Sequence, residues 1–149
     1  KKLKLIEDAT WGNSLNSAFV IDAWELLESI LLKTFKDLKN NNSELITLIV
    51  SRAEIVDYRK DYVEKMANNN NILNIFYPED RLESFGQQNN IEIVSISRYM
   101  SDFNWNKNNE ITQFHGFKST NTLGAGHWNE TGHKFAGEIT GKKICEIYD

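Results

Sequence analysis

The chain has 149 residues, of which 40% are hydrophobic and 26% charged, and its formal net charge is -4. This length fits one domain of ordinary size, and the composition argues against intrinsic disorder because enough apolar side chains are present to build a core. The acidic balance argues against a nucleic-acid partner, since such domains usually carry a basic face. No apolar run is long enough to span a membrane, because Glu28 and Lys33 interrupt the segment Leu26–Phe35.

The first predicted element is a helix over residues 17–42. Ser17 can cap its start, and the run Asn40–Asn42 is typical of its end. Apolar residues recur along it at helical spacing and predict a buried face, formed by Phe19, Ala23, Leu27, Ile30, Leu31 and Phe35.

The middle of the chain alternates between strand and helix patterns. Residues 44–51 form a short, β-branched apolar run, which is typical of a parallel strand covered on both faces. Residues 54–71 predict a more polar helix, whose charged run Asp57–Lys65 is expected to be a solvated face. A third helix is predicted over residues 77–90, with Pro78 in its first turn, and a second strand over residues 91–97.

The last third contains a polar stretch and then a helix. Residues 98–122 predict a long, mostly irregular excursion. A helix is expected from about Glu130 to Ile147, capped by Asn129 or Thr131. Its buried stripe is predicted to contain Ala136, Ile139, Ile144 and Ile147. Cys145, the one cysteine of the chain, allows no internal disulfide and is expected to be a buried small hydrophobic residue.

Strands that alternate with helices predict an α/β fold, a three-layer α/β/α arrangement around a mainly parallel sheet. Only two strands are predicted with clear patterns, and residues 1–6 form a weak third. Small sheets usually need more strands than this. We therefore expect residues 1–149 to be the C-terminal part of a single larger domain, and the start without a methionine to be a cut.

One stretch near the end, Gly124–Glu138 (GAGHWNETGHKFAGE), is rich in side chains that can act in catalysis or binding. Gly124 and Gly126 permit a tight backbone approach beside His127, which precedes the last helix. In open α/β sheets such loops face the ligand crevice, and a histidine is well suited to general-base catalysis near pH 7. The alternative interpretation is a histidine that caps or packs the loop.

Residues 126–139 (GHWNETGHKFAGEI) resemble the C-terminal histidine block of the SGNH/GDSL hydrolases. The similarity extends over most of the chain but is specific only over residues 126–138. It implies a flavodoxin-like three-layer fold, a serine nucleophile and hydrolysis of esters, such as carbohydrate O-acetyl groups or lipid esters. It also implies that His127 takes the proton of the serine hydroxyl and returns it to the leaving group. Trp128 would line the substrate pocket.

The chain departs from this family pattern in two ways. It contains no Gly-Asp-Ser tripeptide, so the nucleophile is expected upstream of Lys1, and the chain alone is expected to be inactive; Ser14 is a weak candidate. The Asp that usually precedes the histidine is replaced by Gly124 and Ala125. A backbone carbonyl, Asp102 or Glu110 could take its place. The alternative is a non-catalytic domain that binds a glycan or a protein partner.

The remaining candidates are histidines and aromatic residues. His115, His127 and His133 lie close in sequence, but His127 and His133 lack the spacing that places two ligands on one helix face, so no metal and no other cofactor are predicted. Trp105 and Trp128 belong to a cluster of aromatic residues around the long polar stretch. Because tryptophan faces stack on sugars, both are predicted to contact a small-molecule or carbohydrate ester; the alternative is that these aromatic side chains anchor the loop to the core.

Overall fold

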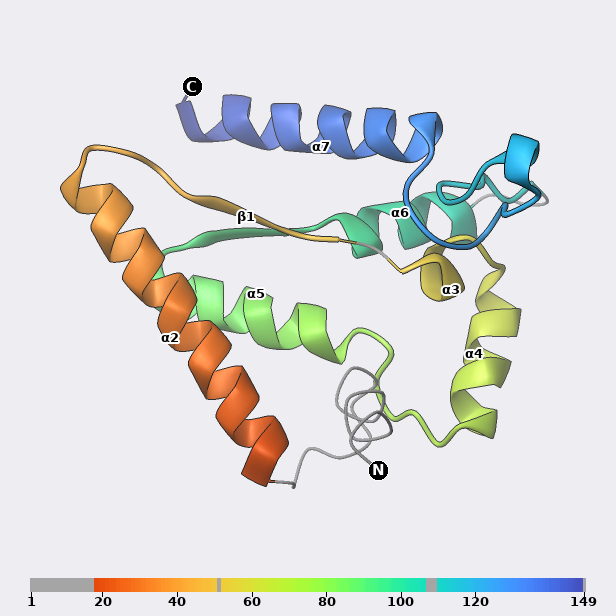
Figure 1. Cartoon of the computed structure of the whole chain (residues 1–149), viewed down its shortest axis with the longest axis horizontal. Helices are drawn as coiled ribbons and strands as arrows, with labels where there is room; N and C mark the ends of the chain where they lie inside the picture. The colour runs from red at the N-terminus through yellow and green to blue at the C-terminus, as the bar shows by residue number, and fades with distance from the viewer. Residues whose placement is uncertain (1–17, 51, 107–109, 149) are drawn as a thin grey trace. The chain divides into compact units, whose positions relative to one another are not determined.

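The computed structural model describes residues 18–50, 52–106 and 110–148 (Figure 1). Helices account for 65% of these residues and strands for 8%. The elements follow one another as α2 (Ala18–Asn40), β1 (Ile46–Ile49), α3 (Ala53–Val56), α4 (Lys60–Asn69), α5 (Tyr77–Asn89), β2 (Glu92–Ser95), α6 (Ile96–Trp105), the 3-10 turn η1 (Lys118–Thr120) and α7 (Glu130–Tyr148).

The described chain divides into two compact units. The first unit contains α2, α5 and most of the sheet. It consists of the residues up to Leu48 and of Ala67–Val94. The second unit contains α3, α6, η1 and α7. It consists of Ile49–Met66 and of the residues from Ser95 onward. Each unit is described separately below.

The predicted three-layer α/β/α fold with a mainly parallel sheet is wrong for the described residues. They are mostly helical, and their one sheet has two parallel strands, β1 and β2, which lie side by side in Figure 1. Each strand is four residues long. A sheet this small has too little surface to separate helices into two covering layers. The weak strand prediction for residues 1–6 lies outside the described residues.

Both strand predictions identified real strands but made them too long. β1 begins and ends two residues inside the predicted range, and β2 gives way directly to α6. The Ser95 side chain accepts a hydrogen bond from the Arg98 backbone N–H at 3.2 Å and caps α6, so no loop separates strand from helix. The prediction of an irregular excursion from residue 98 was therefore wrong for its first part. The prediction that β1 is covered on both faces was also wrong, since Leu48 is 37% exposed.

In the first unit, α2 has the predicted extent, and its Ser17 cap lies outside the described residues. Asn42 has a φ of 53°, the left-handed conformation that ends a helix. The predicted buried face was largely wrong. Val20 is buried, but Phe19 is 53% and Ile30 54% exposed.

Three side-chain contacts between described residues join α2 to α5. The Trp24 and Tyr77 rings meet edge to face with centroids 5.9 Å apart. Arg81 donates from Nε to Glu28 at 2.6 Å, and its guanidinium lies 5.2 Å from the Trp24 ring centroid. α5 itself matches its prediction, with Pro78 in the first turn. These contacts use the middle of α2, while Phe19, Leu26 and Ile30 remain exposed.

The predicted helix over residues 54–71 is broken into α3 and α4. The chain bends after α3 at Asp57, whose backbone N–H still bonds to the Ala53 carbonyl at 2.9 Å. The Asp57 side chain is 2% exposed, so the solvated face predicted for this run was wrong at its first residue. The tertiary contacts of this carboxylate, given below, outweigh the local helical preference.

The core of the second unit lies between α3, α6 and the start of α7. Fully buried apolar side chains fill it: Ile55, Val56, Val63, Ile96, Met100 and Phe114. Phe114 contacts Phe135 of α7 at a centroid distance of 5.0 Å and Phe103 of α6 at 6.0 Å. These aromatic contacts fix the first turns of α7 against α6.

α7 has the predicted extent but not the predicted buried stripe. Ala136 is buried, whereas Ile144 is 41% and Ile147 42% exposed, and Cys145 is exposed as well. The reason is that the packing contacts of α7 come from Phe135 and its neighbours in the first turns. None of the described helices is apolar over a length sufficient to cross a membrane.

Candidate functional site

The candidate site is the loop Gly124–Asn129, called the His127 loop, which leads into α7. Gly124 and Gly126 have φ values of 77° and 79°, a conformation that residues with a side chain rarely adopt. A Cβ at Gly124 would lie 3.1 Å from the Gln113 side chain. The His127 side chain is exposed, and its imidazole makes no hydrogen bond or ion pair within the described ranges. The loop therefore presents an accessible imidazole.

The backbone of the His127 loop is tied to the segment Gln113–Gly116. Gly116 N–H donates to the His127 carbonyl at 2.9 Å, and Asn129 N–H donates to the Phe114 carbonyl at 2.9 Å. These two bonds make an antiparallel bridge between His115 and Trp128. Gly124 N–H adds a bond to the His115 carbonyl at 3.0 Å. Both ends of the loop are thus held by the same four-residue segment.

Asn129 joins the loop to α7, as the sequence predicted. Its Oδ1 accepts from Gly132 N–H at 3.1 Å and caps the helix, while its Nδ2 donates to the Gln113 and Gly116 carbonyls at 2.9 and 3.1 Å. At Gly132 a Cβ would lie 2.4 Å from the Phe114 carbonyl oxygen, so a side chain does not fit there. The first turn of α7 therefore packs directly on the Gln113–Gly116 segment.

Beneath this segment lies a buried carboxylate that sequence reasoning missed. Asp57 Oδ1 accepts from Phe114 N–H at 2.9 Å, and Oδ2 accepts from His115 N–H at 2.8 Å. Oδ2 also lies 3.1 Å from His115 Nδ1. Because an ionised carboxylate can only accept hydrogen bonds, this contact places the proton of the imidazole on Nδ1. Three donors compensate for the burial of the charge.

The predicted acid partners of His127 are not brought to it. Asp102 on α6 and Glu110 are both exposed, and neither is bonded to the His127 imidazole in the part of the chain that is described. The carboxylate that contacts a histidine in this unit, Asp57, binds His115 instead. Ser14 lies outside the described residues, and no described serine hydroxyl is hydrogen-bonded to His127.

The three histidines do not form a metal centre. His115 is 2% exposed and bonded to Asp57, while the His133 ring packs edge to face on Trp128 with centroids 5.6 Å apart. Among the residues that the structure describes, no group of three His, Cys, Asp or Glu side chains could hold a metal ion.

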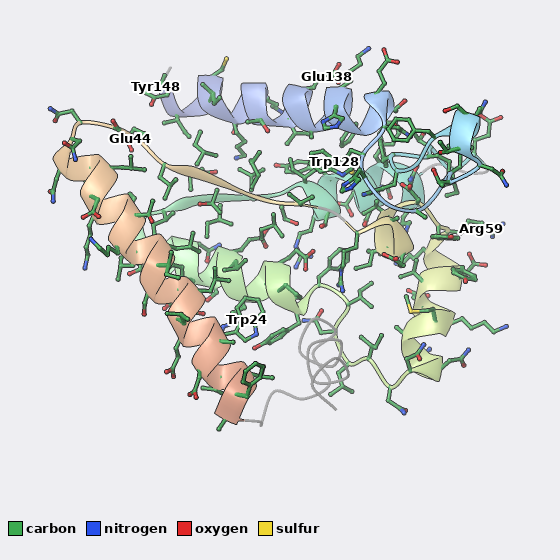
Figure 2. All side chains as sticks on the ribbon, viewed as in Figure 1. Trp24, Glu44, Arg59, Trp128, Glu138 and Tyr148 are labelled. Atoms are coloured by element: carbon green, nitrogen blue, oxygen red, sulfur yellow. The ribbon has the colours of Figure 1, made fainter. Side chains whose placement is uncertain are left out.

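The two tryptophans predicted to contact substrate are half-buried and take part in packing. Trp128 lies at the start of α7, where Figure 2 labels it, against Gly132 and His133. Trp105 ends α6, and its Nε1 donates to the Tyr58 carbonyl at 3.2 Å. Contact with a sugar remains a prediction for both side chains.

Comparison with known proteins identifies no relative. No family model matches the chain, and no curated protein and no solved structure match it. The resemblance of residues 126–138 to the SGNH/GDSL hydrolases therefore remains a prediction.

Proposed function

We propose that the protein is a serine ester hydrolase in which His127 is the general base. The observation that supports this proposal is an exposed imidazole, without a partner among the described residues, on a loop whose backbone is bonded at both ends. A general base needs this combination, because its nitrogen must be accessible and its position must be fixed relative to the reacting hydroxyl. The resemblance of the surrounding block to the SGNH/GDSL hydrolases agrees with the same role.

The proposed reaction has two steps. His127 takes the proton of a serine hydroxyl as the serine oxygen attacks the ester carbonyl, and it then protonates the departing alcohol. Water, activated by the same imidazole, hydrolyses the acyl-enzyme and releases the acid. The serine is expected to come from outside the described residues. Carbohydrate O-acetyl groups and lipid esters are the proposed substrates, with Trp105 and Trp128 as substrate contacts.

The test is ester hydrolysis by the protein expressed from its whole reading frame. With p-nitrophenyl acetate as substrate, His127→Ala should lower kcat by about 100-fold or more, as expected for a lost general base. His133→Ala is the matched control, since it removes a second exposed imidazole six residues further along; this ring packs on Trp128, so KM is free to change while kcat should be retained. Turnover no faster than in buffer, or an active His127→Ala variant, would contradict the proposal.

A second candidate function is a non-catalytic domain that binds a glycan or a protein. One observation favours it: no carboxylate within the described ranges orients the His127 imidazole, and Gly124 and Ala125 stand where the family has an acid. This candidate predicts no ester turnover. It predicts instead that an oligosaccharide perturbs the indole signal of Trp128 in an NMR titration, and that Trp128→Ala abolishes binding.

A further inference from the structure

We infer that Asp57 is the positioning residue of the His127 base, an inference that rests on the proposed function. Asp57 lies at the bend between α3 and α4, and its side chain bonds to Phe114 and His115, not to the His127 loop, among the described residues. It acts through two layers of hydrogen bonds. The carboxylate holds the backbone of Phe114 and His115, and that backbone holds the loop.

The first layer is strong because of its burial and charge. Asp57 is 2% exposed, and its two oxygens receive three N–H groups at 2.8 to 3.1 Å. Hydrogen bonds to an ionised group are shorter and stronger than those between neutral groups, and the surrounding low dielectric strengthens them further. The position of the Phe114–His115 backbone is therefore set by a group 57 to 58 residues away in sequence.

The second layer transmits this position to His127. The carbonyls of Phe114 and His115 accept the N–H groups of Asn129 and Gly124, which lie at the two ends of the His127 loop. The neighbouring Gly116 N–H donates to the carbonyl of His127 itself. A displacement of the Phe114–His115 backbone thus moves both ends of the loop together. The imidazole would move with them while remaining exposed.

The decisive variant is Asp57→Asn, which keeps the shape of the side chain. An amide presents an NH₂ group where one carboxylate oxygen stood, so an N–H donor from the Phe114–His115 backbone faces another donor. The matched control is Asp61→Asn, the same change four residues away at a carboxylate whose side chain is 71% exposed. Two further variants separate the ring from the backbone. His115→Leu removes the ring donor, and His115→Asn retains an N–H donor near the position of Nδ1.

The kinetic readout is the effect on kcat compared with KM for p-nitrophenyl acetate. A misplaced base slows proton transfer without weakening substrate binding, so Asp57→Asn should lower kcat by about 100-fold and leave KM nearly unchanged. His115→Leu should lower kcat less, and His115→Asn should be close to the unmodified protein. Thermal unfolding of each variant identifies any that do not fold; if Asp57→Asn does not, Asp57→Glu, which keeps the charge but displaces the carboxylate, takes its place in both readouts.

The second readout does not depend on activity. In protein labelled with ¹³C-histidine, the Hε1–Cε1 signal of His127, assigned with His127→Ala, should shift or broaden in Asp57→Asn and stay unchanged in Asp61→Asn. If the protein hydrolyses no ester, the proposed function fails, and this signal alone decides whether Asp57 positions His127. A His127 signal and a kcat that are both unaffected in folded Asp57→Asn would overturn the inference. A kcat that falls less in His115→Leu than in Asp57→Asn would support it, by assigning the larger part of the effect to the backbone bonds.

Discussion

The His127 loop and helix α2 are stabilised in opposite ways, and each belongs to a different unit of the chain. The loop has no regular secondary structure, yet its backbone is bonded to a segment that a buried carboxylate holds. α2 is a regular helix of 23 residues, yet Phe19, Leu26 and Ile30 along it are more than half exposed. Directional polar bonds therefore position the loop, whereas α2 is defined by its own backbone hydrogen bonds.

The largest expected effect is on the loop side of this comparison. Asp57→Ala removes the acceptor of three buried donors, and a buried donor left without a partner costs about 1 to 3 kcal/mol, so the free energy of unfolding should fall by about 3 kcal/mol or more. Urea unfolding measures this loss, with Asp61→Ala as the exposed control. A loss no larger than that of the control would mean that water replaces the carboxylate, and the loop would then not be fixed by Asp57.

A smaller effect is expected where α2 meets α5. Arg81→Ala removes the bond to Glu28 and the contact with Trp24, both partly exposed, and should lower the free energy of unfolding by about 1 to 2 kcal/mol. Glu28→Gln, which keeps the side-chain shape, should lower the free energy of unfolding by a smaller amount than Arg81→Ala. Both losses are measured by urea unfolding.

The Arg81 contact also predicts how this loss depends on pH. The hydrogen bond that Arg81 donates to Glu28 holds the pKa of Arg81 above its ordinary value, against a smaller opposing effect of burial. A group whose folded-state pKa is raised contributes its stability fully below its unfolded-state pKa and loses it only as the pH rises through the folded value. The loss in Arg81→Ala should therefore be the same at neutral and mildly alkaline pH. If the loss of unfolding free energy in Arg81→Ala changes between neutral and mildly alkaline pH, a group other than Arg81 titrates in that range.

The smallest effect is expected on the exposed face of α2. Leu26 is 61% exposed, and glutamine has nearly the same helix propensity as leucine, so Leu26→Gln should change the free energy of unfolding by less than about 0.5 kcal/mol. Thermal and urea unfolding both report this quantity. A destabilisation comparable to that of Asp57→Ala would show that Leu26 is buried in solution, and the contrast between the two regions would no longer hold.

The element types along the chain could be predicted because their signals are local. Apolar spacing predicted α2, and Pro78 in the first turn predicted α5. Pro78 and Asn42 mark helix ends through backbone geometry that involves only near neighbours. Where a partner far away in sequence decides the outcome, local signals failed. Asp57 was assigned to a solvated helix face because nothing near it indicates the Phe114 and His115 amides that it binds.

Burial and fold class were predicted less well than element types. An apolar stripe shows that a helix can pack, not that another element is present to cover it, and Ile144 and Ile147 of α7 remain partly exposed. Similarly, two strand patterns predicted a layered α/β fold. A layered sheet depends on how many strands pair, and the residues of a single strand do not encode that number.

By itself, the sequence determined the helices α2, α5 and α7, the presence of two strands, and a histidine beside two glycines ahead of an Asn-capped helix. Each of these depends on backbone preferences and side-chain spacing within a few residues. Only the tertiary structure decided that Asp57 is buried, that it bonds to His115 rather than to His127, and that the Gln113–Gly116 segment holds the His127 loop. Hydrogen bonds between groups more than fifty residues apart require a folded backbone to align donor and acceptor, and a one-dimensional pattern carries no such information.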